Sequence, residues 1–300
     1  MPNTSTATIA VYATTYNSTG SVHSPYVYGI ITCLLTLLCS LFGLVGNGKV
    51  IWILAFCRLS NPFTTYILNL GVADFGTLLS LSARAIILLI PWKCHLVNDL
   101  VFALIFFTYS TSLYFLTVIS MERCFSVMFP IWYRCHRPEK SSAVVSLLLW
   151  IISGLLSGTL WVFDNYLSTE SLPDVLGVIF TLNLLILTPI MVVSTLIMSI
   201  KICCSTQRRQ PPRLYTAILV TLLFFIVFAI PLSVSYFIFS SYGYFLASAL
   251  QSSYLFASFN SSINPVIYYF VGRNRKKRRE SLKVVFKRVF RDDAISPGGT

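Results

Sequence analysis

Residues 27–56 read VYGIITCLLTLLCSLFGLVGNGKVIWILAF, and Lys49 is the one charged residue in this stretch. A helix needs about 20 apolar residues to cross the roughly 30 Å hydrocarbon core of a bilayer. The stretch is long enough to do so. Six more apolar stretches follow, at about 64–90, 98–124, 142–163, 175–202, 215–240 and 246–271. We therefore predict an all-α fold, a seven-transmembrane helix bundle.

The composition of the whole chain agrees with a membrane protein. Of its 300 residues, 56% are hydrophobic and only 11% are charged, and the mean hydropathy is +0.76. A soluble domain carries about 25% charged residues. The surplus apolar surface must face lipid. We expect a membrane domain over 27–271, flanked by short segments at 1–26 and 272–300, without a cleavable signal peptide.

The orientation follows from the positive charges, because Lys and Arg concentrate in cytoplasmic loops. One set of loops holds Arg58, Arg134, Arg137, Lys140, Arg208, Arg209, Arg213 and the basic segment 273–291. The other set holds Lys93 with Asp99, Asp164, Glu170 and Asp174. We predict a plasma-membrane protein with its N-terminus outside and its C-terminus inside. The sequons at Asn3 and Asn17 are then available for glycosylation.

The net charge of +12 lies mainly next to the inner leaflet. There it indicates anionic lipid rather than nucleic acid as the partner. Leu282, Val285, Phe286 and Val289 recur at helical spacing among basic residues. They predict a short amphipathic helix on the membrane surface, with a disordered basic tail as the alternative. Cys203 and Cys204 are candidates for acylation. Cys94 alone lies outside in this topology, so we expect no extracellular disulfide between loops.

Asp74 lies in the middle of the second stretch, where a bare carboxylate is costly. It needs a cation, a proton or hydrogen-bond donors. Candidate neighbours from other stretches are Asn47, Ser112, Asn260, Ser261 and Asn264. Together with Asp74 they form an oxygen-rich set suited to a hard cation such as Na⁺. The alternative is a neutral Asp74 that ties helices together, and the sequence leaves both open.

Prolines interrupt three of the stretches. Asn264-Pro265-Val266-Ile267-Tyr268 ends the seventh stretch, and Pro189 and Pro231 lie in the fifth and sixth. Proline removes a helix hydrogen bond and bends the helix. Such helices are suited to movement between two packings.

Glu122 and Arg123 close the third stretch at its cytoplasmic end. The acid can hold the arginine until a partner's carbonyl groups accept the guanidinium. The alternative is an arginine that extends to the membrane surface. The Asn264-Pro265-x-x-Tyr268 segment favours the switching interpretation.

Arg84 lies in the outer half of the second stretch, where burial of a cation is unfavourable. Either its side chain extends to the outer surface, or it faces a cavity and meets an anion. The acidic loop residues or a ligand carboxylate are candidates for that anion. The sequence leaves both interpretations open.

These residues carry a family resemblance. The pattern resembles the rhodopsin-like (class A) G protein-coupled receptors, in Gly46-Asn47, Ala73-Asp74, Glu122-Arg123, Trp150, Pro189, Pro231 and Asn264-Pro265-x-x-Tyr268. The stretch PIWYRCHRP at 130–138 is similar to the second cytoplasmic loop of the Mas and Mas-related receptors. Most class A receptors have a disulfide-bonded Cys at the outer start of span three. Here that position is Asn98.

The resemblance implies an extracellular ligand, a heterotrimeric G protein and arrestin as partners. It implies switching residues at Glu122, Arg123, Pro189, Phe225, Pro231, Asn264, Pro265 and Tyr268. It implies peptide or small, often basic, ligands, and the acidic outer loops agree with a cationic one. The candidate ligand pocket comprises Arg84, Ile105, Phe106, Tyr109, Trp161, Asp164, Glu170, Asp174 and Tyr254.

Two other functions are weighed against a receptor. A transporter or channel predicts internal repeats and paired broken helices, and the two halves of the chain show no repeat. A membrane enzyme needs a nucleophile and a base. The three histidines, His23, His95 and His136, all lie outside the spans. We expect a non-enzymatic receptor with no cofactor beyond an allosteric Na⁺.

Overall fold

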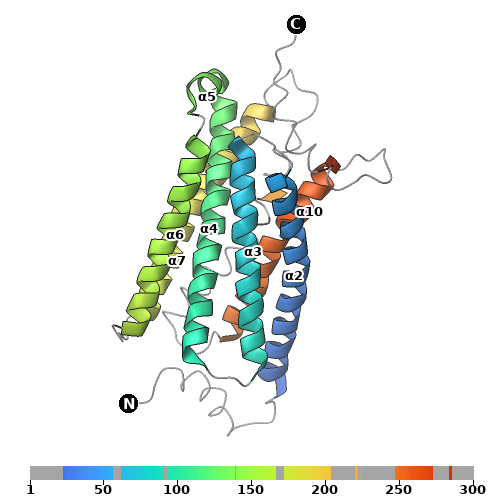
Figure 1. The fold of residues 1–300 in the computed structure, drawn as a ribbon, viewed down its shortest axis with the longest axis vertical. Helices are drawn as coiled ribbons and strands as arrows, with labels where there is room; N and C mark the ends of the chain where they lie inside the picture. The colour runs from blue at the N-terminus through green and yellow to red at the C-terminus, as the bar shows by residue number, and fades with distance from the viewer. Residues whose placement is uncertain are drawn as a thin grey trace.

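A computed structural model describes residues 23–56, 62–90, 94–138, 140–166, 172–203, 220–221, 224, 247–272 and 284–285. These residues form long helices packed as a bundle, and the described ranges contain no strand (Figure 1). The long helices are α2 (His23–Phe56), α3 (Pro62–Leu89), α4 (His95–Met128), α6 (Ser141–Tyr166), α7 (Leu172–Cys203) and α10 (Ala247–Gly272). They coincide with six of the seven predicted spans. The sixth predicted span, 215–240, and the amphipathic segment, 282–291, lie almost wholly outside the described residues.

The short helix α5 (Pro130–His136) is the element that the sequence analysis did not anticipate. α4 continues to Met128, beyond its predicted end, and stops at Phe129, whose backbone N–H donates to the Phe125 carbonyl at 2.9 Å. Pro130 then begins α5, because a proline at the first helical position lacks only an N–H that has no helical partner. The predicted loop is therefore a helix, and it lies at one end of the bundle (Figure 1). We call this the α5 end; α2 begins at the opposite end.

The bundle has the length and apolar surface of a membrane domain. Four of its described helices contain segments long and apolar enough to span a bilayer: Val27–Phe56, Phe63–Leu89, His95–Met128 and Ser141–Val162. The outward face of α6 exposes large apolar side chains such as Leu147, Ile151 and Leu155. In a bilayer these side chains meet lipid instead of water.

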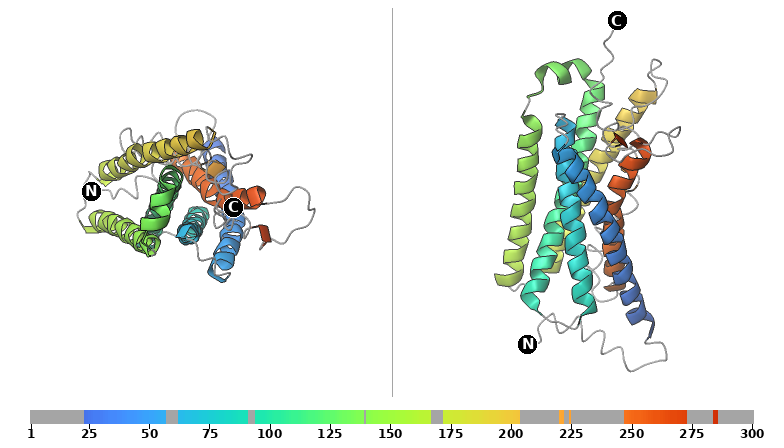
Figure 2. Two further views of the ribbon diagram at one scale, coloured as in Figure 1. Left: turned by 90° about the horizontal axis from the view of Figure 1, so that it is seen from above. Right: turned by 45° about the vertical axis from the view of Figure 1, so that its right-hand side comes forward.

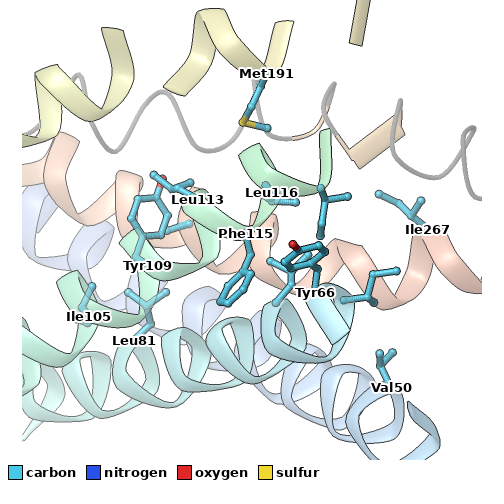
Figure 3. Packing of buried hydrophobic residues seen from close by; sticks show 14 of the residues in the cluster. Val50, Tyr66, Leu81, Ile105, Tyr109, Leu113, Phe115, Leu116, Met191 and Ile267 are labelled. Carbon is cyan, nitrogen blue, oxygen red and sulfur yellow. The ribbon is translucent and has the colours of Figure 1, made fainter. Parts of the chain in front are cut away.

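α4 is the central helix of the described bundle. In the most apolar 18-residue segment of α4, 72% of the residues are buried. The corresponding share is 22–39% in the other three helices that could span a bilayer. It packs against α3, α6 and α7 (Figure 2). A continuous hydrophobic cluster surrounds it, with Tyr66 from α3, Tyr109 and Phe115 from α4, and Met191 from α7 (Figure 3). α4, which corresponds to the third predicted span, therefore lies inside the bundle.

α2 and α10 approach each other closely at two glycines. A Cβ atom on Gly43 would lie 2.2 Å from the Ser262 Oγ and 2.6 Å from the Leu78 Cδ1. A Cβ atom on Gly46 would lie 3.1 Å from the Pro265 Cβ. Small residues at a helix contact permit this separation inside a membrane. The close approach brings polar residues of α2 and α10 together at mid-bundle.

Candidate functional site

Asp74 lies at the centre of a buried polar group in the middle of the bundle. Its side chain is fully buried on α3. The Ser112 hydroxyl of α4 donates to one carboxyl oxygen at 2.7 Å. The Asn264 amide of α10 donates to the other oxygen, also at 2.7 Å. Asp74 therefore joins three helices through hydrogen bonds to one carboxyl group.

Asn47 extends this polar group to α2. Its side-chain N–H₂ donates to the Gly43 carbonyl at 3.0 Å and to the Ser261 carbonyl at 2.9 Å. Asn260 and Ser261 are both buried on α10. Of the five residues that the sequence grouped around Asp74, the structure joins four to this polar group: Asn47, Ser112, Ser261 and Asn264.

The chemistry of this group suits a small monovalent cation. It supplies one carboxylate and several neutral oxygens, including the buried Asn264 Oδ1, which has no hydrogen-bond partner among the described residues. Hard cations prefer such oxygen ligands. A divalent ion usually has more carboxylates, and the described residues contain no cluster of three or more acidic, His or Cys side chains. The residues present therefore fit Na⁺.

Glu122 is the centre of a second polar group, at the α5 end. Its carboxylate accepts hydrogen bonds from the Tyr66 hydroxyl of α3 at 3.0 Å and the Tyr133 hydroxyl of α5 at 2.6 Å. The Arg137 guanidinium, just after α5, forms an ion pair with it at 3.1 Å. One acid thereby ties α5 to α3 and α4. Burial and the Glu122 carboxylate together raise the pKa of the Tyr133 phenol, so it stays protonated and donates.

Arg123 lies on an aromatic ring at the same end. Its guanidinium carbon is 3.3 Å from the centroid of the Phe63 ring, and Phe63 stacks on Tyr133 with centroids 6.1 Å apart. Such cation–π contacts are favourable when the cation is partly desolvated. The sequence suggested that Glu122 holds Arg123. In the structure Tyr66, Tyr133 and Arg137 bind the carboxylate, and Phe63 contacts the arginine.

Sequence reasoning missed these four partners of Glu122 and Arg123. Tyr133 and Arg137 are four residues apart, which places them on one face of a helix. This four-residue spacing was not recognised, because residues 130–138 were interpreted as a loop. Phe63 and Tyr66 carried no signal, since aromatic residues at the start of a span are ordinary packing residues.

Trp150 of α6 has a polar partner and two aromatic neighbours. Its indole N–H donates to the Asn69 Oδ1 of α3 at 2.9 Å. The rings of Phe107 and Phe115 lie 5.4 and 6.1 Å from it, centroid to centroid. The contacts fix α6 against α3 and α4.

At the end opposite α5, Arg84 points into the bundle. Its Nη1 donates a hydrogen bond to the Asn98 Oδ1 at the start of α4. It lines a small hollow with residues of α2, α3 and α10: Thr32, Cys33, Thr36, Leu81, Ala85, Leu88, Gln251 and Tyr254. The Arg84 side chain thus lines a hollow, and its described polar partner is Asn98 rather than an anion. Of the candidate ligand residues, Arg84 and Tyr254 line this hollow.

The other candidate residues are placed elsewhere or lie outside the described part. Ile105, Phe106 and Tyr109 are buried in the hydrophobic cluster, and Trp161 is half-buried on α6. In the switching set, Pro189 is exposed on α7, whereas Pro265 and Tyr268 are buried on α10. Outside the described residues or side chains lie Asn3, Asn17, Asp164, Glu170, Asp174, Phe225 and Pro231.

Comparison with known proteins agrees with this arrangement. Residues 46–268 match the family described as 7 transmembrane receptor (rhodopsin family). The chain is 40% identical to the mouse "Proto-oncogene Mas" over 288 residues, covering 92% of this chain and 87% of the relative. It is 42% identical to rat "Mas-related G-protein coupled receptor member H" over 270 residues, covering 86% and 82%. It is 38% identical to human "Mas-related G-protein coupled receptor member X1" over 278 residues, covering 88% and 85%.

The helical bundle, its buried polar centre and these matches define a multi-pass membrane receptor of the rhodopsin family, not an enzyme. Within that class the chain belongs to the Mas and Mas-related G protein-coupled receptors. The transporter, channel and enzyme alternatives are thereby set aside.

Proposed function

We propose that this receptor converts the binding of an extracellular peptide or small-molecule ligand into activation of a heterotrimeric G protein at the plasma membrane. The observation that carries the proposal is the pair of 2.7 Å hydrogen bonds from Ser112 and Asn264 to Asp74. These bonds couple α3, α4 and α10 between the Arg84 hollow and the Glu122 group. A ligand that shifts one helix therefore changes the packing of the others.

The proposal assigns the α5 end to the cytoplasm. The positive charges of Arg137 and Lys140 near this end support that orientation, because such residues favour the cytoplasmic side. Arg123 is the residue that leaves Phe63 and meets the G protein, and arrestin is a second partner for the same surface. Na⁺ at Asp74 favours the resting packing, because it needs the oxygens of α3, α4 and α10 close together.

The test is G protein activation in cells that express wild-type receptor, Arg123→Ala or Lys201→Ala. Lys201 is an exposed cation at the end of α7. Its removal changes net charge equally without touching the Phe63 contact. We expect basal and cationic-peptide responses to fall to the level of mock cells in Arg123→Ala alone. Equal responses in all three receptors, or solute flux without any G protein response, contradict the proposal.

A further inference from the structure

We infer that the Phe63 ring restrains Arg123 in the resting receptor, and that α5 supports this ring through Tyr133. The inference rests on the proposed function, because it describes how the release of Arg123 to a G protein is regulated. The Arg123 guanidinium carbon lies 3.3 Å from the centroid of the Phe63 ring. Both side chains are buried, with 8% of Arg123 and 6% of Phe63 exposed. The cation is therefore held against the ring, away from most of the water.

The contact favours one of two positions of the arginine. An aromatic ring attracts a cation that lies over its face, and the attraction grows when water is excluded. A planar guanidinium can also stack on such a ring. When the guanidinium turns toward the carbonyl groups of a partner, it loses the contact with the ring. The Phe63 ring therefore stabilises the resting receptor relative to the partner-bound one.

The acid next to Arg123 is occupied by other groups. Glu122 accepts hydrogen bonds from two tyrosine hydroxyls and forms an ion pair with Arg137. Residues 175–279, which include the fifth, sixth and seventh predicted spans, contain no Asp or Glu. A helix in that part of the chain therefore cannot hold Arg123 through an ion pair. This makes the aromatic contact with Phe63 important for the resting position of the arginine.

Tyr133 connects the Phe63 ring to α5. The two rings stack, with centroids 6.1 Å apart and planes inclined by 18°. Arg137, just after α5, has its guanidinium carbon 4.9 Å from the Tyr133 centroid and 6.0 Å from the Phe63 centroid. The Tyr133 hydroxyl is fixed by its 2.6 Å hydrogen bond to Glu122. A movement of α5 therefore shifts Tyr133 and loosens the ring on which Arg123 lies, so Tyr133 acts as a positioning residue.

Fluorination of the Phe63 ring tests the first part of the inference, because it changes the charge on the ring face with little change of shape. Mono-, di- and trifluorophenylalanine are introduced at this position by nonsense suppression. Fluorine withdraws electron density from the ring and weakens its attraction for a cation. The measurement is G protein activation without ligand, divided by the number of receptors at the cell surface. We expect it to rise with each added fluorine, and to rise about fivefold in Phe63→Leu.

The same fluorinated series at Phe115 is the matched control. Phe115 is a fully buried ring on α4 that lies edge-on to the Trp150 ring. Its fluorination perturbs a packed aromatic side chain without changing the ring under Arg123, so basal activation should stay at the wild-type level. Basal activation that does not change across the Phe63 series overturns the inference, and so does an equal rise across the Phe115 series.

Substitution of Tyr133 tests the second part of the inference. Tyr133→Leu removes the stacked ring and should raise basal activation, whereas Tyr133→Phe keeps the ring and should raise it less. Because Tyr133 acts through Phe63, Tyr133→Leu should add little to the effect of Phe63→Leu in the double variant. Unchanged basal activation in Tyr133→Leu, or effects that multiply in the double variant, contradict the role of α5.

The Arg123→Ala receptor separates this inference from the proposed function. If Arg123→Ala is silent while the receptors fluorinated at Phe63 match the wild type, the inference fails and the proposed function stands. If Arg123→Ala signals as strongly as the wild type, the proposed function fails instead.

Discussion

Replacement of Gly43 by alanine tests the close contact that brings the helices of the polar centre together. A new Cβ atom would lie 2.2 Å from the Ser262 Oγ, 2.6 Å from the Leu78 Cδ1 and 2.9 Å from the Ser262 Cβ. Ser262 also loses freedom to move aside, because its hydroxyl donates to the Cys39 carbonyl at 3.0 Å. α10 must therefore move away from α2.

The magnitude follows from three contributions. Overpacking costs roughly 1–3 kcal/mol, and loss of the Ser262 hydrogen bond about 1 kcal/mol. Alanine regains about 1 kcal/mol of helix propensity over glycine. The net expectation is a loss of roughly 1–3 kcal/mol. Gly48→Ala is the matched control on the same helix, because its nearest neighbour is the Phe75 Cε2 at 3.8 Å; it should be neutral or stabilising.

The assay is thermal unfolding of the purified receptor in detergent micelles. At about 2–4 °C per kcal/mol, Gly43→Ala should unfold several degrees below Gly48→Ala. Adding Ser262→Gly to Gly43→Ala removes two of the three close atoms and should recover part of the loss. If Gly43→Ala unfolds at or above the Gly48→Ala temperature, the argued contact between α2 and α10 is wrong.

Three further substitutions test individual bonds. Asp74→Asn can keep both hydrogen bonds, because its amide oxygen can accept from Asn264 and its N–H₂ can donate to the Ser112 hydroxyl. It removes the carboxylate charge and should therefore abolish any thermal stabilisation by NaCl over choline chloride; an equal salt response in both proteins counts against Na⁺ binding. Arg137→Ala removes the ion pair with Glu122 and should speed amide hydrogen exchange across α5; unchanged exchange indicates that the pair does not hold α5. Trp150→Phe loses one hydrogen bond and should lower the unfolding temperature by about 2–4 °C; an unchanged temperature shows that the bond adds nothing.

The long helices were predictable because a helix that crosses a bilayer must be long and apolar. Both properties can be read from a run of consecutive residues. The six long helices lie within a few residues of the predicted spans. α5 was not predictable in this way, since its seven residues, Pro130–His136, are far too short to cross a bilayer. It is held by the distant acid Glu122, and a contact of that kind has no local signature.

The polar centre was predictable for a related reason. A carboxyl in mid-membrane must find partners on neighbouring helices, and few polar side chains lie at the depth of Asp74. The partner of Arg84 could not be found by that argument. Asn98 becomes a neighbour of Arg84 only because the end of α3 and the start of α4 meet. A neutral amide is also not the partner that one would search for first around a buried cation.

The bond between Arg84 and Asn98 has a consequence for how the two helix ends are joined. Asn98 occupies the position where most class A receptors have a covalent cross-link, and Cys94 nearby is a free thiol. A covalent link fixes a separation permanently, whereas a hydrogen bond opens and closes with thermal motion. The link between the end of α3 and the start of α4 is thus a reversible one. It needs no oxidant to form, and reductants do not break it.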